Sequence, residues 1–162
     1  MEITQVTPAD LPAILRIERL GFTPEEAGTE AQYRDRIQKL SETFLVARMD
    51  QKVVGFIVGP ATKEKYVEDW MYEKTPANLA KGGNQIIFTI AVDPEYRGHS
   101  IGSKLLDAME ENAQKHQRES ISLTSLDRNV PFYLKNGFEN VGVADSEHAN
   151  ETWYNLVKKM EK

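Results

Sequence analysis

The chain has 162 residues, of which 40% are hydrophobic and 28% charged, with a formal net charge of −5 at pH 7. These values are typical of one globular domain over residues 1–162; the acidic balance argues against a nucleic-acid partner and is compatible with a cationic substrate. The absence of cysteine excludes disulfides, thiolate metal sites and an acyl-cysteine intermediate. No run approaches the roughly 18 apolar residues of a membrane span, and the N-terminus lacks the pattern of a signal peptide, so we expect a cytoplasmic protein without a membrane partner or a metal.

The N-terminal half predicts a strand, two helices and a hairpin. The strand covers residues 1–6, and a helix follows from Thr7 and Asp10 to about Leu20. A second helix suits residues 29–40, with Thr29 as its cap and an apolar face formed by Tyr33, Ile37 and Leu40. Strands over 43–49 and 52–59 flank the two-residue turn Asp50-Gln51, which is the spacing of a tight hairpin, and a partly helical excursion follows over 60–83.

The C-terminal half alternates strands and helices. We expect strands over 86–92, 119–126, 138–143 and 151–160, and helices over 101–116 and 130–136. The order predicts an α/β fold with a central mixed, mostly antiparallel sheet and helices on both faces. Strands 86–92 and 119–126 are then parallel neighbours joined by a helical crossover. Ligands bind such sheets beyond the carboxyl ends of strands where neighbours part.

The segment from Ile90 to Gly102 has the pattern of an anion-binding loop. Asp93-Pro94 ends a strand, and an amphipathic helix begins at Ile101, inside a loop that contains Gly98 and Gly102. The free amides of a helix N-terminus bind phosphate oxygens, and glycine lets the backbone approach closely. The alternative is an ordinary turn and helix cap. The P-loop pattern G-x-x-x-x-G-K-[ST] and the dinucleotide pattern G-x-G-x-x-G are both absent.

A second segment, residues 129–138, predicts a short helix closed by Gly137 in the left-handed conformation, with Phe138 opening the next strand. This helix carries Tyr133. Taken alone, Tyr133 is interpreted as a half-buried core residue. Because the chain also contains the loop from Arg97 to Gly102, we interpret Tyr133 as an active-site residue.

These two segments together resemble the GNAT acyltransferases. The acetyl-CoA loop of that family, [RQ]-x-x-G-x-[GA], is matched by Arg97 and Gly102, with Ser100 in place of the middle glycine. If Ser100 needs a positive φ, the substitution costs about 1 kcal/mol, although serine is also a good helix cap. The resemblance implies a GNAT fold with two splayed parallel central strands and acetyl-CoA as co-substrate. It assigns cofactor binding to Ile90, Ala91, Val92, Arg97, Gly98, His99, Ser100, Ile101, Gly102, Ser103 and Asn129.

Several segments look most like the arylalkylamine N-acetyltransferase branch, among them residues 17–22, 56–59 and 90–92. That likeness implies that Tyr133 is the general acid for the departing CoA thiolate and that Phe22 borders the amine site; we place Phe88 there too. The branch also has two histidines as a proton relay. The matching positions here are Ile86 and Phe88, so that relay is missing, which argues against serotonin-like specificity.

The sequence does not single out a general base, because it offers several carboxylates and no convincing histidine. The expected function is direct N-acetyl transfer, in a ternary complex, to a primary amine of a small molecule, polyamine or peptide. The alternative is a non-catalytic acetyl-CoA-binding sensor of the same fold. The closing strands could pair in a homodimer. The carboxylates considered are Glu18, Glu25, Glu26, Glu68 and Asp69, the last two in an acidic-aromatic cluster with Trp70 and Tyr72, and the histidines are His99, His116 and His148.

Overall fold

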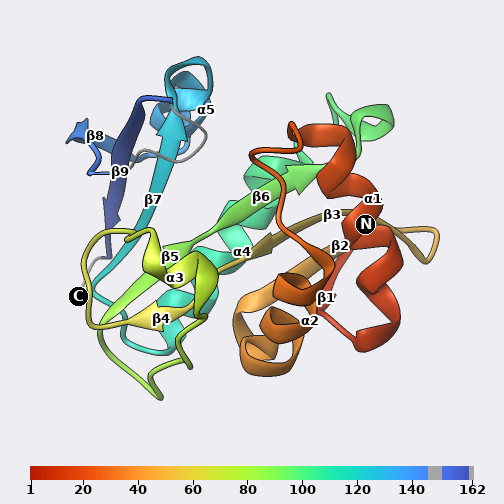
Figure 1. Cartoon of the computed structure of the whole chain (residues 1–162), viewed down its shortest axis with the longest axis horizontal. Coiled ribbons are helices and arrows are strands. Elements are labelled where there is room, and N and C mark those ends of the chain that lie inside the picture. Colours follow the sequence, from red (N-terminus) through yellow and green to blue (C-terminus); the bar gives the residue numbers. More distant parts are fainter. Residues whose placement is uncertain (146–150, 161–162) are drawn as a thin grey trace.

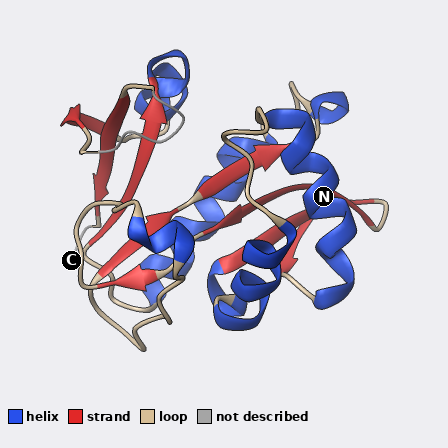
Figure 2. Cartoon of the chain, viewed as in Figure 1, coloured by secondary structure: helices blue, strands red, loops and turns tan. Residues whose placement is uncertain are grey.

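The structure is a computed structural model that describes residues 1–145 and 151–160. Within these ranges the strands form two sheets that lie side by side (Figure 2). The first sheet is antiparallel and has the order β1 (Glu2–Gln5), β2 (Phe44–Met49), β3 (Lys52–Val58), β6 (Thr89–Val92). The second has the order β4 (Ala61–Thr62), β5 (Asn84–Ile87), β7 (Ser120–Leu126), β9 (Trp153–Lys159), β8 (Glu139–Val143), and of its pairs only β5 and β7 run parallel.

The predicted continuous strand 86–92 is wrong, because the chain changes sheets at Phe88. The amide of Phe88 donates to Val58 O at 2.8 Å, while Val58 also pairs with Thr89, so two residues oppose one as in a β-bulge. The backbones approach closely here: a Cβ on Gly59 would lie 1.8 Å from Ile86 O. As a result β5 continues beside β7, whereas β6 turns away with β3 (Figure 1). The predicted single sheet is therefore two sheets, and the predicted splay lies between β6 and β7.

Helices cover both faces of the first sheet, as predicted. Successive side chains of a strand point to opposite faces, and here the side chains on both faces are apolar. Leu45 and Ala47 pack with α4 (Ile101–Lys115), whereas Phe44 and Val46, on the opposite face, pack with α1 (Leu11–Gly21) and α2 (Glu30–Lys39). Figure 1 shows α1 and α2 in front of the sheet and α4 behind it. The remaining α-helices of the described chain are α3 (Trp70–Glu73) and α5 (Val130–Lys135), and short 3₁₀ turns cover Pro8–Asp10, Ser41–Thr43, Pro94–Tyr96 and Asp127–Asn129.

Local sequence signals explain several element ends. Asp50 and Gln51 both have positive φ, at 52° and 69°, which gives the β2–β3 hairpin the right-handed twist of its strands. Thr29 and Gln32 form a capping box at the start of α2. Gly137, at φ +91°, closes α5, where the amide of Phe138 donates to Tyr133 O at 3.0 Å. No helix in the described ranges combines the length and apolar character needed to cross a membrane.

Candidate functional site

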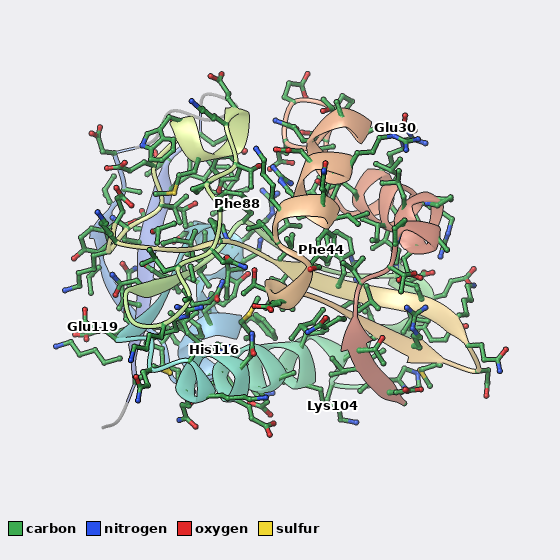
Figure 3. The ribbon with its side chains drawn as sticks, turned by 90° about the horizontal axis from the view of Figure 1, so that it is seen from below. Glu30, Phe44, Phe88, Lys104, His116 and Glu119 are labelled. Carbon is green, nitrogen blue, oxygen red and sulfur yellow. The ribbon has the colours of Figure 1, made fainter. Side chains whose placement is uncertain are left out.

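A cavity of about 620 Å³ opens where β6 and β7 diverge. Thr89 and Ile90 of β6 form one side of it, and Thr124, Ser125 and Leu126 of β7 form another. Figure 3 shows Phe88, which also lines the cavity, near the middle of the molecule. The other walls come from α1, the α1–α2 connection, α2, α3, the turn Asp127–Asn129, α5 and β9, and their lining residues include Glu18, Phe22, Glu26, Gly28, Arg36, Tyr72, Arg128, Asn129, Tyr133 and Trp153.

The structure brings six of the predicted site residues to this cavity and places the others in β6, in the loop that follows it and in the first turn of α4. The side chains of Ala91 and Ile101 are buried in the two cores, so these residues offer only their backbone to a ligand. Val92, Gly102 and Ser103 are half-buried, and Gly98, His99 and Ser100 are exposed. The six that line the cavity are Phe22, Phe88, Ile90, Arg97, Asn129 and Tyr133.

The loop between β6 and α4 is held in shape by its first residue. The carboxylate of Asp93 accepts hydrogen bonds from the Glu95 amide and from Arg16 Nη1, both at 3.0 Å. Gly98 adopts φ +87° and Ser100 adopts φ +60°. Ser100 therefore does need a positive φ, which costs about 1 kcal/mol relative to glycine, as expected from the sequence. The Ser100 side chain makes no cap hydrogen bond with α4, so the expected compensation by side-chain capping is absent.

The start of α4 has the features of a phosphate site. Its first turn leaves the amides of Ile101, Gly102 and Ser103 without partners inside the helix, and they point toward the loop. Along β6, alternation of the backbone sends the amides of Ile90 and Val92 away from β3, toward the edge that faces β7, because the Asp93 amide bonds Val54 O on the β3 side. A helix N-terminus beside an unpaired strand edge fits a diphosphate joined to an extended amide chain, which is the chemistry of acetyl-CoA.

Tyr133 projects from α5 into the cavity with an available hydroxyl. The residue is 8% exposed, and its ring packs edge-on against Phe132 and Phe138. Burial raises the pKa of Tyr133 above its ordinary value, and nearby Tyr72 adds to this, so the phenol stays protonated. Among the described residues the hydroxyl has no hydrogen-bond partner. It is therefore free to donate a proton to a group bound in the cavity.

Glu18, one of the carboxylates considered from the sequence, combines burial with a free oxygen atom. It lies on the buried face of α1 and is 2% exposed. Its Oε2 accepts hydrogen bonds from the Gly28 amide at 2.7 Å and the Tyr33 hydroxyl at 2.8 Å, whereas Oε1 has no partner among the described residues. Burial raises the pKa of Glu18, although these hydrogen bonds and Arg36 oppose the shift. A raised pKa makes this carboxylate a stronger base.

The other carboxylates considered as bases are less suited. Glu26 lines the cavity, but its hydrogen bonds from Thr23 and the charge of Arg128, 3.6 Å away, outweigh burial and lower its pKa. Glu25, Glu68 and Asp69 are exposed and lie outside the lining, so the outer part of the acidic-aromatic cluster is a solvated surface and only Tyr72 reaches the cavity.

The described histidines, His99 and His116, do not line this cavity. His99 is exposed in the loop, and His116 is at the end of α4, with Nδ1 2.9 Å from Asn112 O (Figure 3). His148 lies outside the described residues. Within the described ranges, no three His, Cys, Asp or Glu side chains are grouped as a metal site.

Sequence reasoning missed Arg36, which is the most buried cation of the cavity wall. It is 2% exposed, and its guanidinium carbon lies 4.8 Å from the ring centre of Tyr33 and 4.9 Å from that of Phe88. A signal for it was present. Arg36 occupies a position in the apolar stripe of α2, between Tyr33 and Leu40. A charged side chain is rarely buried at such a position unless it has a partner or a function.

Comparisons with known proteins agree with this geometry. A family model described as an acetyltransferase (GNAT) domain matches residues 41–140, which is more than half of the chain. An uncharacterised N-acetyltransferase of Methanocaldococcus jannaschii is 28% identical over 120 residues, covering 72% of this chain and 45% of that protein. The chain thus spans less than half the length of the curated relative that it matches.

Solved structures share the fold at low sequence identity. Ard1 from Thermoplasma volcanium superposes with a TM-score of 0.79 at 22% identity, covering 99% of this chain and 98% of that one. The GNAT-like decarboxylase GphF in complex with isobutyryl-CoA gives 0.83 at 16%, covering 99% and 100%. Naa50 of Arabidopsis thaliana, in complex with a bisubstrate analogue of CoA and a peptide, gives 0.75 at 21%, covering 98% and 97%.

Proposed function

This chain belongs to the GNAT family of acetyltransferases, and from that membership we propose that it moves the acetyl group of acetyl-CoA directly to a primary amine within a ternary complex. One observation carries the proposal. A buried carboxylate with a free oxygen, Glu18, and a buried phenol, Tyr133, line the same cavity, which opens between the diverging strands near the N-terminus of α4. Proton transfer from an amine and to a thiolate requires one group of each kind.

Acetyl-CoA would bind across the splay. Its diphosphate would accept hydrogen bonds from the first amides of α4, where the helix dipole also favours negative charge. Its pantetheine would follow the free edge of β6 and bring the thioester into the cavity. Arg97, which lines the cavity and begins the loop, would add a cation beside the phosphates.

The acceptor amine must first lose a proton. A primary amine has a pKa near 10, so it is mostly protonated at pH 7, and only the neutral form attacks a thioester. Glu18 Oε1 would take this proton, held in place by the two hydrogen bonds at Oε2. The nitrogen then bonds to the carbonyl carbon, and the carbonyl oxygen becomes an oxyanion. A backbone N–H of Ile90 or Val92 would stabilise this charge, a contribution of about 3 kcal/mol for one well-placed donor.

Collapse of this intermediate breaks the C–S bond. Tyr133 would donate its proton to the departing thiolate and recover one from solvent. Of the two protons that the ammonium loses overall, one ends on sulfur and the other is released. A phenol has an ordinary pKa near 10 and burial raises the pKa of Tyr133 further, so the donor is protonated throughout the physiological range of pH. No covalent acyl-enzyme is required.

Acceptor-dependent release of the CoA thiol tests the proposal. Small amines, polyamines and peptides with a free N-terminus belong in the panel, the last because Naa50 was solved with a peptide-containing analogue. Release with at least one acceptor, confirmed by mass spectrometry of the acetylated product, is the expected result. An acetyl-CoA-binding protein that releases no thiol with any acceptor is instead the non-catalytic sensor.

A further inference from the structure

The charges of the cavity wall form an unusual pair. Glu18 and Arg36 are each 2% exposed, and both line the cavity. The two groups are close: Glu18 Oε2 and Arg36 Nη1 lie 3.2 Å and 3.3 Å from the point that a Cβ on Gly28 would occupy. Yet no ion pair or hydrogen bond joins them within the described part of the chain. Oε1 of Glu18 and Nε of Arg36 are both buried without partners.

Arg36 contacts two aromatic rings in the cavity wall. Its guanidinium carbon lies over the rings of Tyr33 and Phe88, which stabilises the buried cation through the ring quadrupoles. A cation–π contact uses none of the N–H donors of the guanidinium, so they stay available for hydrogen bonds. Among the described residues none accepts a hydrogen bond from Arg36. The planar fork of Arg36 matches the two oxygens of a carboxylate, which is the group that such a fork binds most specifically.

An ion pair that only stabilised the fold would have a different geometry. A buried charge left without a direct partner destabilises a protein, so structural pairs bring nitrogen and oxygen into contact. Here Glu18 accepts hydrogen bonds from Gly28 and Tyr33, and Arg36 donates none to a described residue. A carboxylate and a guanidinium that lie apart in a cavity wall fit a zwitterionic ligand, whose cation faces the carboxylate and whose anion faces the guanidinium.

We propose that Arg36 binds a carboxylate of the acceptor, so that the preferred acceptor is an amino acid whose ammonium faces Glu18 and whose carboxylate faces Arg36. This inference rests on the proposed function, because it takes Glu18 as the group that receives the amine proton. The acceptor carboxylate must then lie next to the amine, as Arg36 lies next to Glu18. An α-amino acid meets that condition, since one carbon carries both groups.

The test compares acceptors that differ only in the carboxylate, namely phenylalanine with phenethylamine and alanine with ethylamine. We expect wild-type kcat/KM to be about 10- to 100-fold higher for each amino acid, the ratio that a hydrogen-bonded charged group supplies. Arg36→Gln should lower kcat/KM for the amino acid about 10- to 100-fold more than for the matched amine. Arg34→Gln is the matched control: Arg34 is on the same helix, its side chain is 66% exposed, and the preference should be unchanged.

Loss of folding in Arg36→Gln is checked by thermal unfolding, and Arg36→Met, which keeps an apolar chain beside the rings of Tyr33 and Phe88, replaces it if needed. In either case, the ratio of the wild-type kcat/KM for each amino acid to that for its matched amine decides the question, because it needs no variant. Equal or better use of the amines overturns the carboxylate role but leaves the acetyltransferase proposal intact. Faster reaction with succinyl-CoA than with acetyl-CoA, reversed in Arg36→Gln, would assign Arg36 to the acyl donor and also overturn it. Absence of thiol release with every amine and amino acid would instead contradict the proposed function itself.

Discussion

Replacement of Glu18 separates its role as a base from its role in the fold. In Glu18→Gln, the amide oxygen can take the place of Oε2 and keep the hydrogen bonds from the Gly28 amide and the Tyr33 hydroxyl, while the NH₂ group takes the place of the unpartnered Oε1. The variant should unfold within about 1 kcal/mol of wild type. Glu18→Ala removes the oxygen that accepts both hydrogen bonds and leaves the Gly28 amide and the Tyr33 hydroxyl without this acceptor, at about 1–3 kcal/mol each, so we expect a loss of about 4 kcal/mol.

Activity should follow a different pattern from stability. Both variants lack the base, so kcat/KM should fall by about 10²- to 10⁴-fold in each. Chemical denaturation gives the free energy of unfolding, and thiol release gives kcat/KM. Glu25→Gln is the control, because Glu25 is exposed and outside the cavity, and it should match wild type in both assays. Substantial activity in Glu18→Gln would refute the assignment of the base, and equal destabilisation by Gln and Ala would refute the hydrogen-bond reasoning.

Three further predictions concern proton transfer and charge. Tyr133→Phe should lower kcat about 100-fold with little change in acetyl-CoA affinity, measured by steady-state kinetics and calorimetry; a fall in affinity alone would contradict the role of Tyr133 as proton donor. The pKa of Glu18 is raised, so kcat/KM should increase with pH at values above the ordinary carboxylate range, and this limb should vanish in Glu18→Gln. The folded state then holds a proton that the unfolded state has released, so wild-type stability should fall as pH rises from 4.5 through the raised pKa, a slope that Glu18→Gln should lack. Asp10 has a lowered pKa because its hydrogen bonds with Arg48 and Thr7 outweigh burial; Asp10→Asn should therefore lower the melting temperature at pH 7, and the difference should shrink as pH falls below 3.8.

The elements nearest the site could be predicted because their signals are local. Asp93-Pro94 ends β6 and Ile101 begins α4, as the sequence indicated, since proline and the change of apolar period act within a few residues. Gly137 closes α5 after Tyr133 for the same reason. These signals were sufficient to bring Arg97, Asn129 and Tyr133 to one cavity, although their roles in binding and catalysis stay predictions.

Features that depend on distant parts of the chain could not be predicted in this way. The break at Phe88 depends on a hydrogen bond to Val58, thirty residues earlier, and on the close approach of Gly59 to Ile86. Glu18 was one of several equivalent carboxylates until its partners Gly28 and Tyr33 were known. Arg36 was hidden by the apolar residues around it in α2, because a helical stripe shows which face is buried but not what a buried charge contacts.

Binding of acetyl-CoA at the start of α4 is the central claim, and thermal unfolding tests it most directly. At about 100 times its dissociation constant, a ligand that binds only the folded state adds about 2.7 kcal/mol, which for a chain of this size raises the melting temperature by about 5 to 10 °C. We predict this rise with acetyl-CoA and not with ATP or NAD. Ser103→Glu, which places a carboxylate in the first turn of α4, should leave the unliganded protein folded, because acidic residues suit a helix N-terminus, and should remove most of the rise. An unchanged melting temperature of the wild type, or an equal rise in Ser103→Glu, would contradict the account.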